Sequence, residues 1–233
     1  MARVQHLRYE EALALAGCRI RRLAPMPEFP DSVFVEDTAV VLDHTVVIAR
    51  PGAASRRMEV TTVANVLEAL RPITYIDPPG TLDGGDVLRI GRQIFVGLSS
   101  RTNKDGAAML EAIASSRGYH VTRVPVARCL HLKSAVTAID DGTVLLNPDR
   151  VDRAIFADYE VVEIDRREPE AANVLRIGEV LICASGFPFT RSMLDELGCR
   201  IISVNMSEFA KAEGAVTCCS IILDAPRAAA AAA

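Results

Sequence analysis

Two adjacent cysteines near the end of the chain, Cys218 and Cys219, are the side chains best suited to nucleophilic chemistry. They lie in the run 214–223, whose small and apolar residues predict a strand. Neighbouring side chains of a strand point to opposite faces, so only one of the two thiols can face a given site. We take Cys218 as the nucleophile, against the common alternative that a free cysteine packs as a small apolar side chain.

A histidine and a carboxylate could activate such a thiol. A free cysteine has a pKa of about 8.5, and a nearby imidazolium raises the fraction of thiolate at neutral pH. His131 is the natural partner of Cys218, and Asp83 could orient its imidazole. A lone histidine in a strand is more often structural, and only its place in the repeat described below favours a catalytic role.

Two carboxylates, Glu36 and Asp37, interrupt the apolar run 33–42. Buried carboxylates are costly unless they are paired or hydrogen-bonded. A bound guanidinium would satisfy both, and a salt bridge to one of the chain's own arginines would do so equally well. Arg56 and Arg101 each follow a predicted strand and could bind a substrate carboxylate, although a single arginine is usually solvated.

These candidate residues recur along the chain at a nearly constant spacing. Glu36, Asp83, His131, Asn173 and Cys218 are separated by 47, 48, 42 and 45 residues. A period of this length indicates repeated supersecondary units that bury their faces against one another. Five such units suggest a ring, and equivalent positions in a ring converge on its axis.

Each unit is expected to contain a hairpin, a helix and a further strand. In the first four units these elements are predicted, in chain order, at 33–42, 45–49, 58–70 and 74–76; at 83–90, 93–97, 106–115 and 120–126; at 130–139, 143–146, 152–156 and 160–164; and at 173–177, 180–184, 190–197 and 200–204. The fifth unit would combine strand 214–223 with helix 5–17 and strand 18–23. Its return strand is missing.

The composition is that of an ordinary globular protein. The chain has 233 residues, half of them apolar, and a net charge of −4, which is too mild to indicate nucleic acid or a membrane surface. We expect one domain over 1–227 and an oligo-alanine tail over 228–233 without function. No signal peptide or membrane span is expected. Six cysteines without zinc-like spacing predict free thiols and a cytoplasmic protein.

Several segments resemble one known family. They are F-P-D-S-V-F-V-E-D-T-A-V-V, R-P-G-A-A-S-R-R-M-E-V, T-L-D-G-G-D-V-L, V-G-L-S-S-R-T-N, V-P-V-A-R-C-L-H-L-K-S and M-S-E-F-A-K-A-E-G-A-V-T-C-C-S. In this order, from about Phe29 to Leu223, the chain resembles dimethylarginine dimethylaminohydrolase, a guanidino-modifying enzyme. The resemblance implies a five-bladed α/β propeller of ββαβ units. The family begins with a further strand and a lid loop, which this chain lacks before Gln5, so the closing blade would miss its N-terminal strand.

The resemblance also assigns roles to individual positions. Cys218 would be the nucleophile, His131 the general acid and base, and Asp83 the acidic member of the triad. The substrate-binding set would comprise Asp31, Glu36 and Asp37 for the guanidinium, Arg56 and Arg101 for the carboxylate, and the main-chain carbonyl of Ala212 for the α-amine.

The implied reaction is hydrolysis of asymmetric dimethylarginine or monomethylarginine to citrulline and dimethylamine or methylamine, through a covalent thiouronium on Cys218. No cofactor is expected, and a zinc ion on Cys218 and His131 would have two protein ligands and be inhibitory at most. The partner would be a small molecule, with the chain a monomer or a homodimer. The alternatives are an arginine or agmatine deiminase, an amidinotransferase, or a non-catalytic propeller that serves as an interaction module.

Overall fold

The computed structural model describes residues 1–223, so the predicted alanine tail at 228–233 lies outside the described residues. No helix in this part of the chain is long and apolar enough to cross a membrane. The helices of the described residues are α1 (Ala2–Leu15), α2 (Val60–Glu68), α3 (Lys104–Ser115), α4 (Pro188–Glu196) and the short α5 (Ser207–Ala210).

The strands within residues 1–223 form four small mixed sheets of three strands each. In every sheet the central strand runs antiparallel to the strand before it and parallel to the strand that follows the crossover. The sheets are β1 (Ala39–Leu42), β2 (Thr45–Ile48) and β3 (Ile73–Tyr75); β4 (Val87–Ile90), β5 (Gln93–Leu98) and β6 (His120–Pro125); β7 (Val136–Ala138), β8 (Thr143–Leu146) and β9 (Glu160–Glu163); and β10 (Val174–Ile177), β11 (Val180–Ala184) and β12 (Arg200–Val204). The predicted repeat of hairpin, helix and strand is therefore confirmed in four units.

Local sequence explains why each unit folds in this way. Gly91 and Gly178 have φ values of +56° and +58°, and a glycine at the tip of a tight hairpin adopts this conformation without strain. The central strands are apolar on both faces, and all four residues of β2 are buried. In α3, Ala107, Leu110 and Ala114 recur at helical spacing and face the core.

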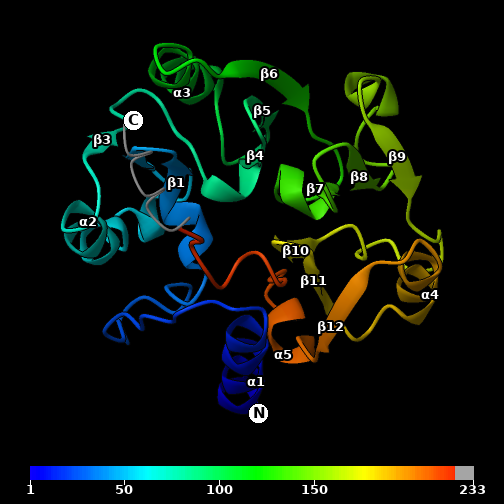
Figure 1. The fold of residues 1–233 in the computed structure, drawn as a ribbon. Coiled ribbons are helices and arrows are strands. Elements are labelled where there is room, and N and C mark those ends of the chain that lie inside the picture. Colours follow the sequence, from blue (N-terminus) through cyan, green and yellow to red (C-terminus); the bar gives the residue numbers. More distant parts are fainter. Residues whose placement is uncertain (224–233) are drawn as a thin grey trace, which may run out of the picture.

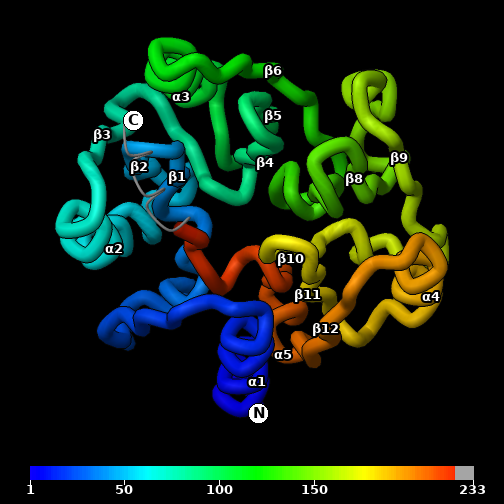
Figure 2. The backbone as a smooth tube through the Cα atoms, in the orientation of Figure 1, coloured from blue at the N-terminus to red at the C-terminus, as the bar shows by residue number. Residues whose placement is uncertain are grey.

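The four sheets lie around a common centre, with the larger helices on the outer side (Figure 1). Helix α1 and the last described residues occupy the remaining sector, between the first and fourth sheets. The backbone tube shows the segment after α1 and the segment that ends the described chain passing through this same sector (Figure 2). Segments from both ends of the chain thus meet beside the first unit.

The predicted strands 18–23 and 214–223 are wrong, because neither segment is a strand in the structure. In the four complete units the central return strand bonds to both of its neighbours. The fifth unit has no such strand among the described residues, so its two outer segments have no central strand to pair with. Both still pack on the same apolar clusters, Cys18 with Ile222 in one and Leu23 with Ile221 in the other.

The predicted strands that begin at the repeated positions are shorter than expected. Glu36 and Asp37 lie on a 3₁₀ turn, Val35–Thr38, which precedes β1. Asp83 directly precedes a similar turn, Gly84–Asp86, and His131 precedes Leu132–Ser134. These turns place the repeated polar residues before the strands rather than within them.

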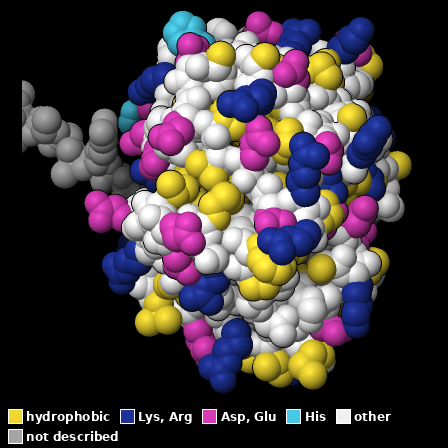
Figure 3. Space-filling model, turned by 90° about the vertical axis from the view of Figure 1, so that its right-hand side faces the viewer, with side chains coloured by type: hydrophobic (Ala, Val, Ile, Leu, Met, Phe, Trp, Pro, Cys, Tyr) yellow, Lys and Arg dark blue, Asp and Glu magenta, His cyan; other side chains and the backbone are white. Residues whose placement is uncertain are grey.

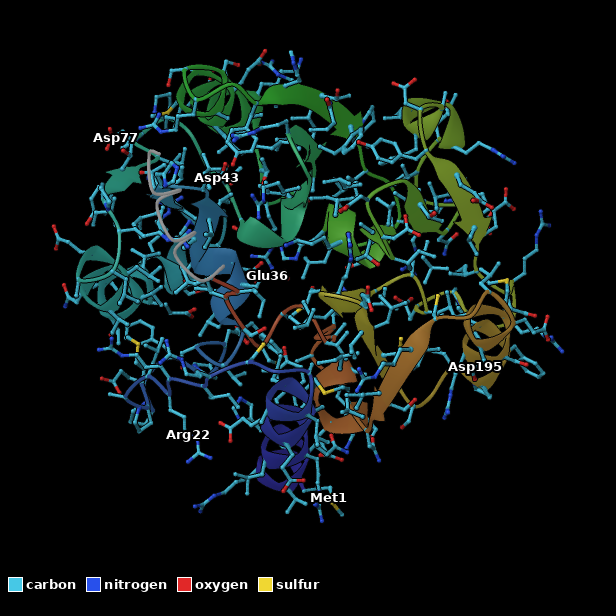
Figure 4. All side chains as sticks on the ribbon, in the orientation of Figure 1. Met1, Arg22, Glu36, Asp43, Asp77 and Asp195 are labelled. Atoms are coloured by element: carbon cyan, nitrogen blue, oxygen red, sulfur yellow. The ribbon has the colours of Figure 1, made fainter. Side chains whose placement is uncertain are left out.

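Charged side chains of both signs are interspersed on the face seen in the space-filling view (Figure 3). This distribution agrees with the small net charge of −4. In the stick view, Glu36 lies toward the centre of the molecule, whereas Met1, Arg22, Asp77 and Asp195 lie at the periphery (Figure 4). The central region is therefore the place to look for a functional site.

Candidate active site

Hydrogen bonds connect the opening residues of successive units around the centre. In the first unit, Asp37 Oδ1 accepts from the amide of Gly85 in the second unit at 3.0 Å. Asp86 Oδ1 of the second unit accepts from the amide of Leu132 in the third unit at 2.9 Å. The opening positions that the sequence spacing grouped together are thus linked from unit one to unit three.

The series continues to the end of the described chain and returns to the first unit. Asn173 Nδ2 donates to the carbonyl of Lys133 at 3.0 Å, and Asn173 Oδ1 accepts from the amide of Thr217 at 3.1 Å. The amide of Glu36 then donates to the carbonyl of Cys218 at 3.1 Å. These contacts connect all five units at or beside their repeated positions, including the segment that carries the thiol.

His131 lies buried between two carboxylates. Its Nε2 is 3.0 Å from Asp83 Oδ2 and 3.7 Å from Asp37 Oδ1. Burial by itself would lower the pKa of His131, but the charge of Asp37 and the hydrogen bond with Asp83 outweigh it and raise the pKa to about 9. The imidazole is therefore held in its protonated form at neutral pH, as a general acid requires.

The main chain at Gly85 approaches this histidine closely. A Cβ atom at residue 85 would lie 2.7 Å from His131 Nδ1 and 2.8 Å from Asp37 Oδ1. Glycine is thus required at position 85, because only a hydrogen atom fits beside the imidazole.

Glu36 is buried, and both of its carboxylate oxygens are engaged. Lys133 Nζ forms an ion pair with Oε1, and Thr217 Oγ1 donates to Oε2 at 2.7 Å. The carboxylate therefore joins the third unit, through Lys133, to the residue that directly precedes Cys218.

Arg56 is turned inward and forms ion pairs with two carboxylates. Its Nη1 is 2.6 Å from Asp37 Oδ2, and its Nη2 is 2.9 Å from Glu59 Oε2. Nη2 also donates to the carbonyls of Asp31 and Phe34. Asp37 thus has the internal arginine partner that the sequence left open, and the expected contact of Arg56 with a substrate carboxylate stays a prediction.

The Arg101 side chain is half-buried, and its guanidinium makes no hydrogen bond or ion pair with a side chain or carbonyl of residues 1–223. The residue follows β5, in the loop that meets Gly52, where an added Cβ would lie 2.4 Å from the carbonyl oxygen of Arg101. Arg101 therefore keeps its guanidinium donors available for a ligand, whereas most of those of Arg56 are already used within the described residues. Ala212 is exposed, in the turn that follows α5.

The two cysteines differ in their surroundings. Cys219 is buried in an apolar cluster with Val216 and Phe209, whereas Cys218 is partly exposed at the edge of that cluster. The amide of Ala215 donates to Cys218 Sγ at 3.4 Å. The preference for Cys218 as the reactive thiol thus remains, although the expected strand that motivated it is absent.

The resting thiol is in an environment that disfavours the thiolate. Burial raises the pKa of Cys218 to about 12, with further increases from the charges of Glu36 and Asp37, against smaller lowering contributions from Ala215 and Thr217. A positive charge placed among these groups would oppose both effects. A cation bound beside Cys218 would therefore favour its thiolate.

Sequence reasoning missed several polar residues of this site. Asp86 is fully buried and accepts hydrogen bonds from the hydroxyls of Ser99 and Thr102 at 2.6 and 2.7 Å. Burial raises its pKa, opposed chiefly by His131. The charged residues Glu59 and Lys133 were also missed, because nothing in their local sequence indicates the ion pairs that they form across the fold.

Among residues 1–223, one group of side chains has the spacing of a metal site, with ligand atoms of Asp37, Asp83 and His131 within 4.8 Å of one another. Cys218, where an inhibitory zinc ion was considered, does not belong to this group. The ion pair with Arg56 already uses one carboxylate oxygen of Asp37.

Comparisons with known proteins agree on one superfamily. The family profile described as "Arginine deiminase" matches residues 19–177. The chain is 35% identical over 219 residues to the N(G),N(G)-dimethylarginine dimethylaminohydrolase of Pseudomonas aeruginosa, with 93% of this chain and 86% of that protein covered. It is 42% identical over 217 residues to the protein of the same name from Streptomyces coelicolor, with 92% and 83% covered.

A solved structure shows the same similarity in three dimensions. The dimethylarginine dimethylaminohydrolase of Pseudomonas aeruginosa, complexed with citrulline, superposes with a TM-score of 0.87 at 34% identity. The match covers 93% of this chain and 86% of the other. The four sheets and the chain order of their units are therefore a shared architecture.

Proposed function

Because the chain belongs to the dimethylarginine dimethylaminohydrolase family, we propose that it hydrolyses Nω-methylated arginines to citrulline and methylamine or dimethylamine. One chain of contacts carries this proposal. His131 is buried 3.0 Å from Asp83 and also lies beside Asp37, and the amide of the adjacent Glu36 bonds to the carbonyl of Cys218. The reaction class is cleavage of a carbon–nitrogen bond of a linear amidine.

The charges around the thiol favour a guanidinium as the ligand. A planar guanidinium has five N–H donors when unmethylated, keeps at least about three when asymmetrically dimethylated, and pairs well with carboxylates such as Glu36 and Asp37. Once bound there, its charge would lower the pKa of Cys218 and offset the effect of the two acids. Asp31 would contribute from the rim, Arg101 and Arg56 would bind the substrate carboxylate, and the carbonyl of Ala212 would accept from the α-amine.

The chemistry then proceeds in two steps. The Cys218 thiolate attacks the guanidinium carbon and forms a C–S bond, while His131 protonates the departing methylated amine as its C–N bond breaks. Asp83 holds Nε2 of the imidazole, which leaves Nδ1 for proton transfer. His131 next takes a proton from water, which attacks the thiouronium carbon. The C–S bond breaks, citrulline leaves, and the thiol is restored.

We further propose that the repeated units are blades of a five-bladed α/β propeller of ββαβ units. The hydrogen bonds that the amides of Gly85, Thr217 and Glu36 donate to Asp37, Asn173 and the Cys218 carbonyl, respectively, support this closure. The six free cysteines favour a reducing compartment such as the cytoplasm. The partner of the chain would be its small-molecule substrate, rather than a nucleic acid or a membrane, and the chain would act as a monomer or a homodimer.

A deiminase of arginine or agmatine is the second candidate, because the matching profile is that of arginine deiminase. Hydrolysis of a methylated arginine releases an alkylated amine, whereas a deiminase releases ammonia, and both leave a ureido compound. Measuring citrulline from dimethylarginine, monomethylarginine and arginine under identical conditions separates them. Faster turnover of unmethylated arginine would favour the deiminase.

The decisive experiment compares Cys218→Ser with Cys219→Ser. We expect Cys218→Ser to lose at least about 1,000-fold in kcat while it still binds substrate, because a serine hydroxyl is a far weaker nucleophile in this setting. Cys219→Ser, with the same chemical change at a buried neighbour, should retain kcat. A cationic haloacetamidine should label Cys218 selectively in the wild-type chain. Native turnover by Cys218→Ser would refute the assignment.

A further inference from the structure

An amide and a hydroxyl connect the fourth unit to the thiol-bearing segment. Asn173 Nδ2 donates to Thr217 Oγ1 at 3.0 Å, while Asn173 Oδ1 accepts from the amide of Thr217 at 3.1 Å. A single side chain therefore holds both the backbone and the side chain of the residue directly before Cys218. Such a two-point contact fixes a backbone direction as well as a position.

Both residues are deeply buried, with 4% of each exposed, and their polar atoms have directed partners. The Thr217 hydroxyl has one proton, which it donates to Glu36 Oε2 at 2.7 Å. It must therefore accept from Asn173, whose second amide hydrogen reaches the carbonyl of Lys133 at 3.0 Å. The direction of each bond is thus determined, and an acceptor could not replace the Asn173 amide donor.

This arrangement controls two groups that the proposed reaction needs in a fixed relation. Glu36 receives the Thr217 hydroxyl on one carboxylate oxygen, and its own amide donates to the Cys218 carbonyl at 3.1 Å. The acid predicted to bind the guanidinium and the predicted nucleophile are therefore joined twice, by this main-chain bond and by the hydroxyl of Thr217, the residue next to Cys218.

We propose that Asn173 and Thr217 are positioning residues that orient the Cys218 segment against the Glu36 carboxylate. The inference rests on the proposed function for its consequence, namely that the guanidinium carbon is presented to the thiol. Neither side chain needs to touch the substrate. A shift of about 1 Å at a reacting atom costs roughly 100-fold in rate, so a modest displacement would be visible.

Thr217→Val and Thr217→Ser form a matched pair for the test. Valine keeps the branched shape and removes the hydroxyl, whereas serine keeps the hydroxyl and removes a methyl group. The first measurement is the rate of Cys218 alkylation by iodoacetamide between pH 7 and 10, with the site located by mass spectrometry. We expect Thr217→Val to react about tenfold more slowly than the wild type, because Glu36 then lacks a donor and the thiolate is less stable. Thr217→Ser should react at nearly the wild-type rate.

Turnover of dimethylarginine is the second measurement. We expect a loss in kcat of about 10- to 100-fold for Thr217→Val, with recovery in Thr217→Ser. Asn173→Asp provides a second route, because it keeps the acceptor for the Thr217 amide but replaces the donor with a carboxylate. It should follow Thr217→Val in both measurements while the chain remains folded.

Unchanged or faster alkylation in Thr217→Val would overturn the proposal, since simple loosening of the site exposes the thiol and speeds the reaction. Equal losses in Thr217→Ser and Thr217→Val would also overturn it, because packing rather than hydrogen bonding would then be the cause. Alkylation does not depend on the natural substrate. A wild-type chain that fails to hydrolyse methylarginine would refute the proposed function and leave the alkylation comparison intact.

Discussion

Replacing Gly85 with alanine would test whether the position of His131 is set by the space beside the main chain. The added Cβ would lie 2.7 Å from Nδ1 of the imidazole and 2.8 Å from Oδ1 of Asp37. Non-bonded heavy atoms rest at about 3.5 Å or more, so the imidazole must retreat by roughly 0.8 Å. Asp37 cannot yield easily, because its other carboxylate oxygen is bound by Arg56 at 2.6 Å.

A retreat of this size is large enough to weaken or break the hydrogen bond between His131 and Asp83, which measures 3.0 Å. A hydrogen bond to a charged group contributes about 1.5–3 kcal/mol. We therefore expect kcat/KM of Gly85→Ala to fall by about 10- to 150-fold. The pKa of His131, which the two carboxylates raise to about 9, should also fall.

The assay is the pH dependence of citrulline formation from dimethylarginine. In the proposed reaction, a protonated His131 releases the amine. Activity should therefore be lost above its pKa, and the alkaline limb should move to lower pH in Gly85→Ala. Gly186→Ala is the matched control, because a Cβ at that position meets no heavy atom within 4 Å. Its profile should coincide with that of the wild type.

Two outcomes would contradict this reasoning. One is a folded Gly85→Ala protein with kcat/KM within twofold of the wild type, which would mean that the imidazole does not need its present position. The other is a reduced rate with an unchanged alkaline limb, which would show that the contact with Asp83 survives and that the added methyl group acts elsewhere.

Two further predictions concern charges buried in the site. The pKa of His131 is raised to about 9 in the folded chain, from an ordinary value of 6.5, so the stability that it contributes is complete below pH 6.5 and is lost as the pH rises through 9. Chemical denaturation of the wild type over this range should show a loss of roughly 3 kcal/mol in the free energy of unfolding, and His131→Asn should not show it. Parallel profiles of the two proteins would contradict the assignment of a charged imidazole. Arg56→Gln leaves Asp37 and Glu59 without their shared cation and should lower the free energy of unfolding by about 3–5 kcal/mol. Arg101→Gln should change the free energy of unfolding by no more than about 0.5 kcal/mol and should raise KM. The reverse pattern would mean that Arg101 stabilises the fold and Arg56 binds the substrate.

Local patterns predicted the elements of the four complete units because each unit carries its own signals. Apolar runs such as 45–48 and 180–184, and helical spacing such as that of Leu110 and Ala114, depend on nearby residues alone. The even spacing of the polar positions then indicated which distant residues meet. Hydrogen bonds between successive units confirmed that grouping, since the amide of Glu36 reaches Cys218 across the chain.

The sequence could not predict the features that are decided by contacts between distant segments. The runs 18–23 and 214–223 have strand-like composition, yet an edge segment becomes a strand only when a partner bonds to it. The inward rotation of Arg56 was equally hidden, because it depends on Glu59 and Asp37 lying on either side of the guanidinium. Propensity describes single segments, whereas both outcomes are set by tertiary contacts.

The balance of charge around the thiol explains how such a site can discriminate among substrates. Buried carboxylates outnumber the cations Arg56, Lys133 and His131, and burial together with the charges of Glu36 and Asp37 raises the pKa of Cys218 to about 12. A neutral amide or urea would leave that balance unchanged, so the thiol would remain protonated beside it. In the proposed reaction, a guanidinium bound by Glu36 would supply the missing positive charge at the carbon to be attacked. Substrate recognition and activation of the nucleophile would then be the same electrostatic event, and reactivity would be confined to cationic substrates.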